Sequence, residues 1–173
     1  MSRAFVKEGD DDLSAGELPE RPLSDHPNYV TPRGLELLQA RLKELQESRE
    51  RLAAEDEAMN KQKLLEVKRD IRYYKTQLER ANVVDPAGQP QDEVRFGATV
   101  TIREQGTKQH AFHLVGDDEA DVTSGLISWA SPLAKAMIGA KVGDTVMWQR
   151  PAGPVEIEIV DIRYDAGHSA HRT

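Results

Sequence analysis

Apolar residues recur in a heptad rhythm between residues 31 and 82, in two runs. The first run consists of Leu35, Leu38, Leu42, Leu45 and Leu52, with Arg49 at the skipped core position, and the second of Leu64, Val67, Ile71, Tyr74, Leu78 and Ala81. Steps of three and four residues place every member of a run on one face of an α-helix. The pattern therefore predicts two helices, each with one apolar seam, the first capped by Thr31 with Pro32 at its first helical position.

The two seams mirror each other around residue 58. Leu45 and Ile71 lie equally far from it, as do Leu42 and Tyr74. A chain that folds back there pairs every core position with another, which a coiled coil between two chains does not require. The sequence thus predicts an antiparallel helical hairpin over residues 29–84, with the two-chain coiled coil as the alternative. At about 1.5 Å per residue the arm extends roughly 35 Å.

Residues 93–165 follow a different pattern, with short alternating or apolar runs separated by turn residues. Strands are predicted at residues 94–102, 111–115, 126–129, 145–148 and 155–162. Between the third and fourth of these runs, Ser131 and Pro132 suit the cap and first position of a short helix that Gly139 ends. A small sheet with one covering helix places this domain in the α+β class.

Three segments show no such periodicity. Residues 1–28 contain an acidic run at residues 9–12 and several prolines, which predicts an irregular N-terminal extension; residues 18–22 alternatively lie extended against the hairpin base. Residues 85–92 carry Pro and Gly and are predicted to be a linker. Residues 166–173 are polar and are predicted to form a flexible tail.

Composition narrows the classes of function. The formal net charge of −7 argues against binding free DNA through an overall positive field. The chain contains no cysteine, which excludes disulfides and thiolate metal sites. No stretch approaches the roughly 20 apolar residues of a membrane span, and the N-terminus lacks the apolar segment of a secretion signal. We therefore expect a cytoplasmic protein that does not bind membranes.

Three consecutive carboxylates stand at the predicted fold-back: Glu55, Asp56 and Glu57. Carboxylate oxygens are the ligands that Mg²⁺ prefers, and Mg²⁺ usually shares its ligands with a substrate. Consecutive residues of a helix point in different directions, so the three side chains converge only in a non-helical turn. The alternative is a solvated turn with ordinary surface acids.

Four cations fall on one side of the second predicted helix: Lys61, Lys68, Arg72 and Lys75. A stripe of this kind suits contact with the phosphates of RNA or DNA inside a larger complex. Acidic residues interleave with the stripe, and the alternative is a set of surface ion pairs that contribute little stability.

The second half contains five characteristic blocks, at residues 94–100 (VRFGATV), 115–121 (VGDDEAD), 127–128 (IS), 131–139 (SPLAKAMIG) and 141–144 (KVGD). Together these blocks resemble the C-terminal domain of the Gre family of bacterial transcript-cleavage factors. The blocks occur in family order and cover nearly all of residues 94–164. Residues 1–8 (MSRAFVKE) and 29–34 (YVTPRG) are similar to the GreB branch of that family.

The resemblance implies a coiled-coil hairpin joined to a small domain of FKBP-like fold. It also implies a monomeric accessory factor, not itself an enzyme, whose hairpin enters the secondary channel of RNA polymerase while the C-terminal domain binds the channel rim. RNA or DNA would then be contacted only within the polymerase complex. Six residues of the matching blocks are candidates for docking on polymerase: Asp117, Asp118, Glu119, Asp121, Ser131 and Pro132.

The tip departs from the family. Family hairpins are longer and carry a motif close to Gly-Asp-Leu-Ser-Glu-Asn-Ala-Glu-Tyr, which helps to position a second Mg²⁺ ion in the polymerase active site, and this chain lacks it. No catalytic residue is therefore carried over, and two functions stay open. Either Asp56 and Glu57 share a Mg²⁺ with polymerase and stimulate transcript cleavage, or the protein regulates initiation or pausing without cleavage; it binds no cofactor alone.

A third function, peptidyl-prolyl isomerase, follows only from the FKBP-like fold, and fold does not imply function. The aromatic residues of the second half are too dispersed in sequence to identify a proline pocket. They are Phe96, Phe112, Trp129, Trp148 and Tyr164.

Overall fold

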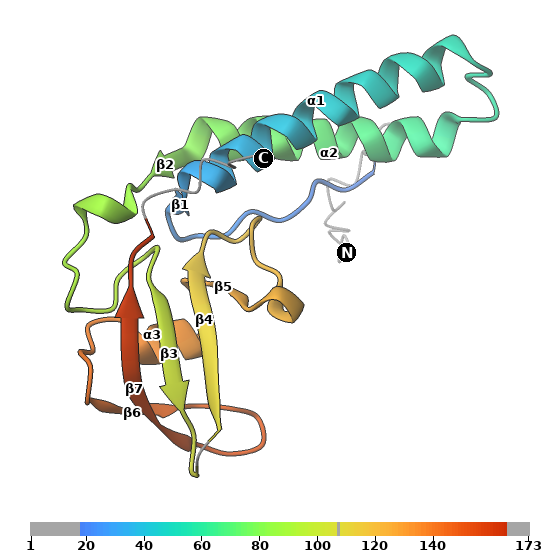
Figure 1. Ribbon diagram of the computed structural model, residues 1–173. Coiled ribbons are helices and arrows are strands. Elements are labelled where there is room, and N and C mark those ends of the chain that lie inside the picture. The colour runs from blue at the N-terminus through green and yellow to red at the C-terminus, as the bar shows by residue number, and fades with distance from the viewer. Residues whose placement is uncertain (1–17, 107, 166–173) are drawn as a thin grey trace, which may run out of the picture. The chain divides into compact units, whose positions relative to one another are not determined.

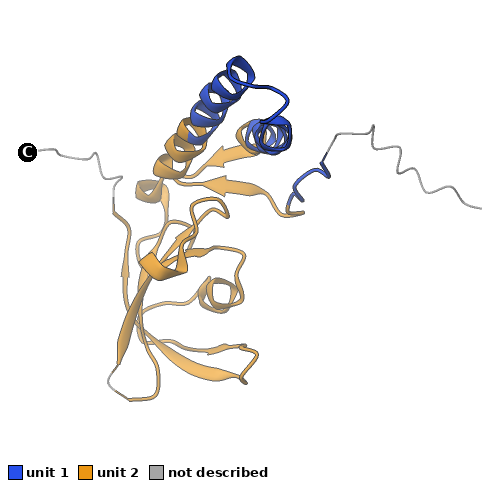
Figure 2. Cartoon of the chain, turned by 90° about the vertical axis from the view of Figure 1, so that its right-hand side faces the viewer, with its two compact units in different colours: residues 1–23, 41–76 blue, residues 24–40, 77–173 orange. Residues whose placement is uncertain are grey.

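The computed structural model describes residues 18–106 and 108–165 of the chain. Two compact units emerge, coloured separately in Figure 2. We call residues 18–23 and 41–76 the arm unit, and residues 24–40, 77–106 and 108–165 the sheet unit. This division differs from the predicted one, in which residues 29–84 form a single hairpin domain, because the hairpin base groups with the sheet. None of the helices in the described part of the chain combines the length and apolar character needed to cross a membrane.

Two helices, α1 (Pro32–Ala54) and α2 (Lys61–Arg80), run antiparallel side by side (Figure 1). The backbone amide of Gly34 donates to Thr31 Oγ1 at 2.9 Å, so the predicted cap at the start of α1 is confirmed. Residues 55–60 form the turn between the helices, which places the fold-back where the mirrored seams predict it. The predicted antiparallel hairpin within one chain is therefore confirmed.

The seam is most deeply buried at every second core position. Leu45, Leu52, Leu64 and Ile71 are buried in the arm unit, whereas the alternate positions, including Arg49 and Tyr74, are half-buried. A charged side chain is tolerated at Arg49 because this layer remains partly open to water. The hairpin thus depends on a small number of leucine and isoleucine contacts.

Leu45→Ala is expected to destabilise the arm by about 2 kcal/mol, the lower end of the range for a buried leucine because the arm is thin. Leu45 is 5% exposed and belongs to the buried layer of the seam. Thermal unfolding followed by helical circular dichroism measures the change. Leu37→Ala, at an exposed position of the same helix, is the matched control and should leave the melting curve almost unchanged. Equal melting temperatures for the two variants would contradict the placement of Leu45 in a buried seam.

The hairpin base contains a two-stranded parallel sheet. Strand β1 (Asn28–Val30) pairs with β2 (Ala81–Val83). Ala81 therefore lies in a strand and does not end the helical seam, which is a correction. Asn28 is buried and its Nδ2 donates to the carbonyl oxygen of Gln77 at 2.9 Å, which joins the strand to the last turn of α2.

The second sheet has five strands in the order β5-β4-β3-β7-β6 (Figure 1). They are β3 (Thr99–Arg103), β4 (Gln109–Val115), β5 (Leu126–Ser128), β6 (Thr145–Trp148) and β7 (Val155–Arg163). Only β4 and β5 pair in parallel; the other neighbours are antiparallel. Two short 3-10 helices, η1 (Pro86–Gly88) and η2 (Val122–Ser124), lie between elements.

One helix, α3 (Pro132–Met137), packs on the apolar core of this sheet. Leu133, Ala134 and Met137 of the helix are buried against a cluster that includes Ile102 and Leu114. The α+β class, with one covering helix, is confirmed.

The strand predicted at residues 94–102 is only half correct. Val94, Phe96 and Ala98 are buried, as their alternation requires, but the strand begins at Thr99. Gly97 adopts a φ of 88°, and the Ala98 amide donates to the Arg95 carbonyl at 3.1 Å in a turn. An alternating pattern of apolar and polar residues predicts which side chains are buried. It does not distinguish a strand from an irregular buried segment.

Candidate functional site

The hairpin tip is a non-helical turn shaped by Asp56. Its Oδ1 accepts hydrogen bonds from the backbone amides of Ala58 at 3.0 Å and Met59 at 3.3 Å. Asn60 Nδ2 lies 3.4 Å from both the Leu52 carbonyl oxygen and Glu55 Oε2. An aspartate that accepts from the amides two and three residues ahead stabilises a tight turn. Asp56 therefore has a structural role at the tip.

The tip carboxylates do not form a metal centre on their own. No three Asp, Glu, His or Cys side chains are placed to bind a metal ion anywhere in residues 18–106 and 108–165. Glu57 is exposed, and Met59 beside it is 85% exposed, which is unusual for a large apolar side chain. A cation at this tip would need ligands from a partner.

The predicted cationic stripe is only partly available. Lys61, Lys68 and Lys75 are exposed along α2, but Arg72 Nε donates to Glu20 Oε1 at 2.6 Å. Arg72 is thus less free than the three lysines, and its predicted contact with nucleic acid stays a prediction.

Residues 18–23 lie along the middle of α2, not at the hairpin base as the alternative interpretation proposed. The Arg21 guanidinium stands 3.8 Å from the centre of the Tyr73 ring and 3.6 Å from Asp70 Oδ1. The predicted irregular extension is thus held against the arm over this stretch. Residues 1–17 lie outside the described residues.

The acidic loop predicted to dock on polymerase faces into the sheet unit. Glu119 is 7% exposed and accepts a hydrogen bond from Thr31 Oγ1 at 2.5 Å, at the start of α1. Asp118 Oδ2 accepts from Gln77 Nε2 at 2.7 Å. Because Glu119 is buried and the side chain of Asp118 is engaged, these two residues join the loop to the hairpin base. These contacts give both residues a structural role, and their predicted docking role stays a prediction.

Asp117 is bonded on both carboxylate oxygens. Ser128 Oγ donates to Oδ1 at 2.5 Å, while Ser24 Oγ and His26 Nε2 lie 3.0 Å and 2.6 Å from Oδ2. Burial alone would raise the pKa of this carboxyl, but the hydrogen bonds from Ser128, His26 and Ser24 outweigh it and hold the pKa below its ordinary value. Asp117 thus binds the segment before β1, and its predicted docking role stays a prediction.

The other three docking candidates remain at the surface. Asp121 is exposed, caps η2 and accepts from Thr123 Oγ1 at 2.6 Å and Ser124 Oγ at 2.8 Å. These hydroxyl groups lower the pKa of Asp121. Ser131 caps α3, accepting from the Ala134 amide at 3.3 Å, and Pro132 is exposed at its first position. Asp121 and Ser131 cap their helices and still remain at the surface, so these two residues and Pro132 are accessible to a partner.

Ser131 and Pro132 border an apolar groove of about 450 Å³. Its other lining residues are Phe112, Val122, Ile127, Leu133, Trp148, Gln149, Arg150 and Pro151. Phe112 and Trp148, which are far apart in the sequence, meet here with Ile127. No pattern in the sequence marks Arg150, whose position in the groove depends on the turn after β6.

Three comparisons bear on this arrangement. Residues 89–164 match the family model described as "Transcription elongation factor, GreA/GreB, C-term". The chain is 42% identical over 111 residues to transcription elongation factor GreA of Trichlorobacter lovleyi, covering 64% of this chain and 69% of that protein. It is 35% identical over 153 residues to transcription elongation factor GreB of Neisseria meningitidis, covering 79% of this chain and 94% of that protein.

This chain belongs to the GreA/GreB family of transcription elongation factors. The family suggested by residues 94–144 is thereby confirmed. Among solved structures, GreA factor homolog 1 of Thermus thermophilus aligns with 80% of this chain and 99% of that one, at 24% identity and a TM-score of 0.38.

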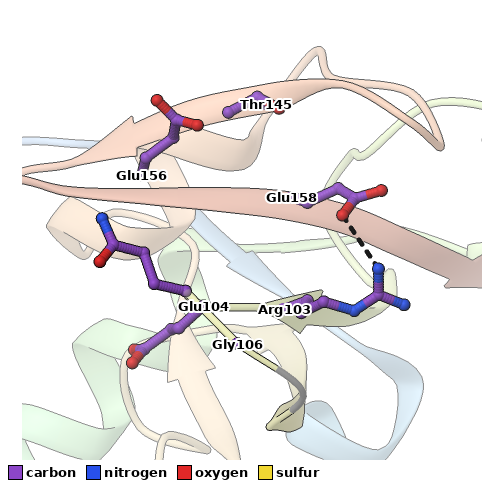
Figure 3. Close-up of a pocket in the computed structure, with 7 residues that line it drawn as sticks. Arg103, Glu104, Gly106, Thr145, Glu156 and Glu158 are labelled. Atoms are coloured by element: carbon purple, nitrogen blue, oxygen red, sulfur yellow. Dashed lines mark hydrogen bonds and ion pairs between the residues drawn. The ribbon is translucent and has the colours of Figure 1, made fainter.

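This GreA/GreB family member also has a second groove, which is polar and is not lined by a comparable set of apolar side chains. It measures about 240 Å³ and lies where β3, β6 and β7 meet (Figure 3). Arg103 Nη1 donates to Glu158 Oε2 at 3.1 Å across the strands, and Glu104 and Glu156 point in different directions. Both side chains of the ion pair are partly exposed to solvent, so the pair contributes little stability. The exposed tip and the apolar groove are therefore the two functional candidates.

Proposed function

We propose that this chain is an accessory factor of RNA polymerase that acts as a monomer. The hairpin enters the secondary channel, and the sheet unit docks on the channel rim. The observation that carries the proposal is the tip: a thin two-helix arm ends in an exposed turn with Glu57 and Met59 directed to solvent. An arm with one seam buries little apolar surface, so its length is better explained by reach than by stability.

At the end of the channel, Glu57 and the remaining oxygen of Asp56 would serve as ligands to a Mg²⁺ ion shared with the polymerase active site. Two carboxylates from outside raise the occupancy of a weakly held ion. Such an ion would orient the water that cleaves the transcript. Lys61, Lys68 and Lys75 along α2 would contact RNA or DNA phosphates only within that complex.

A second candidate function is regulation of initiation or pausing without cleavage. One observation favours it: Asp56 uses Oδ1 to hold the turn, which leaves Glu57 as the tip carboxylate with the greater freedom to reach a metal. A single mobile carboxylate would support weak cleavage at most. In both cases the chain works by occupying the channel.

The proposed docking of the sheet unit on polymerase is tested by substitutions at Pro132, which lines the groove, and at the exposed Asp121. The double variant Asp121→Ala, Pro132→Ala should bind RNA polymerase at least about tenfold more weakly, the size of effect expected for interface anchors. Equilibrium binding of the fluorescently labelled protein to purified polymerase measures this. Asp121→Asn, Pro132→Ala keeps an oxygen to cap η2 and should lose nearly as much affinity.

Asp161→Ala, at a half-buried position on β7, is the control and should bind like the natural chain. Undiminished binding by both double variants, with the sheet unit still folded, would contradict docking through these residues.

A further inference from the structure

Residues 18–23, which we call the strap, lie along the surface of α2 (Figure 1). None of the six side chains is buried, and Leu23 is 44% exposed. Pro19 and Pro22 lack an amide hydrogen and favour extended backbone, and no backbone group of the strap is hydrogen-bonded to another backbone group of the described residues. Side-chain contacts therefore hold the strap against the helix.

Glu20 and Arg21 make the charged contacts of the strap, and both contacts are open to water. Glu20 Oε1 accepts from Arg72 Nε at 2.6 Å, although the Glu20 side chain is 61% exposed. The Arg21 guanidinium covers the face of the Tyr73 ring and stands 3.6 Å from Asp70 Oδ1. Exposed ion pairs and exposed contacts of a cation with a ring each contribute little, so the strap can leave α2 at low cost.

The Glu20 carboxylate lies in the middle of the cationic stripe. Arg72 follows Lys68 by four residues and precedes Lys75 by three, so the three cations share one side of α2. Carboxylates and phosphates both accept from arginine through anionic oxygens. Glu20 therefore occupies the position on Arg72 that a nucleic-acid phosphate would take.

We propose that the strap is a built-in competitor, which covers Arg72 until nucleic acid inside the polymerase complex displaces it. The inference rests on the proposed function and adds a means of regulating the contact with nucleic acid. While the strap is closed, only the three lysines of the stripe are available, which weakens attachment to RNA or DNA outside the complex. Inside the complex, Arg72 exchanges Glu20 for a phosphate and the strap detaches. A closed strap lowers the apparent affinity by the fraction of chains that it covers, so loosening it raises the affinity.

The test is equilibrium binding of the labelled, full-length protein to a stalled elongation complex. Glu20→Gln should bind about two- to fivefold more tightly than the natural chain, the range of one exposed ion pair. Arg21→Gln should also bind more tightly, although it removes a positive charge and simple attraction to phosphates would then weaken binding. Glu47→Gln, exposed on α1, is the matched control for the charge of Glu20→Gln and should bind nearly like the natural chain.

A second comparison asks whether Arg72 is the residue that the strap covers. In an Arg72→Gln background, Glu20→Gln should have no further effect, because the competitor and its site act as a coupled pair. The same gain in affinity with and without Arg72 would therefore overturn the inference. Polymerase free of nucleic acid is the control for the competing ligand, and Glu20→Gln should bind it like the natural chain.

The remaining outcomes separate the inference from the proposed function. If either Glu20→Gln or Arg21→Gln binds the stalled complex no more tightly than the natural chain, the strap only stabilises the arm, and the inference is wrong while the proposed function stands. If Glu20→Gln gains equally on polymerase free of nucleic acid, the competing group belongs to the protein and the inference is also wrong. If the natural chain does not bind polymerase at all, both are wrong.

Discussion

Replacing Gly116 with alanine is expected to destabilise the sheet unit by about 3 kcal/mol or more, at or above the upper end for overpacking a tight site. A Cβ atom at this position would meet the backbone carbonyl oxygen of Tyr29 more closely than real Cβ atoms approach. Neither backbone can move freely, because Tyr29 lies in β1 and the next three residues of the loop are bonded to His26, Gln77 and Thr31. Loop 116–119 and β1 must therefore separate.

Chemical denaturation measures the loss, and Gly88→Ala is the matched control. A Cβ atom at Gly88 meets no atom within 4 Å, so this variant should be as stable as the natural chain. The near-ultraviolet signal of Trp129 should also change in Gly116→Ala, because the Trp129 ring contacts Tyr29 and His26. Full stability of Gly116→Ala would show that the hairpin base does not approach the loop as described.

The tip should give the largest effect on activity. In a stalled elongation complex at limiting Mg²⁺, the natural chain is expected to stimulate transcript cleavage weakly, and Glu57→Gln should reduce that stimulation by at least about tenfold. The substitution removes a ligand charge and keeps the size of the side chain. Asp56→Ala should reduce it as well, because the turn loses the acceptor for the Ala58 and Met59 amides.

Asp56→Asn separates the two roles of Asp56. Its amide oxygen can still accept from Ala58 and Met59, so the turn persists while the charge is lost. Activity close to the natural level would assign Asp56 to the turn alone, whereas a loss equal to that of Glu57→Gln would make it a metal ligand. If robust cleavage survives in all three variants, the tip-carboxylate mechanism is wrong. If channel occupancy persists and nothing cleaves at any Mg²⁺ concentration, the chain belongs to the non-cleaving class.

The hairpin was predictable because its information is local and repeated. Leu45 and Ile71 belong to runs in which every third or fourth residue carries the same signal, so one irregular position such as Arg49 does not hide the pattern. The helix start at Ser131 and Pro132 was equally local, since a cap is determined by a few neighbouring residues.

The contacts that the acidic loop makes within the chain could not be predicted, because most of its partners are distant in sequence. Asp117, Asp118 and Glu119 have the composition of a solvated turn. Their hydrogen bonds with His26, Gln77 and Thr31 span 91, 41 and 88 positions of the sequence, and no periodic pattern records such pairs. The groove could not be predicted for the same reason, because Phe112 and Arg150 come together only after the sheet has formed.

The position of the tip inside polymerase is the most direct test of the proposed function. The chain has no cysteine and Met59 is 85% exposed, so Met59→Cys provides a single attachment point for a short photo-crosslinker at the tip. Val142→Cys, exposed before β6, provides the matched control on the sheet unit. In a stalled elongation complex we expect the tip probe to crosslink to polymerase residues of the active centre or to the RNA 3′ end, and the control probe to neither. Binding to polymerase with no crosslink from the tip probe to the active centre or the RNA would contradict the account.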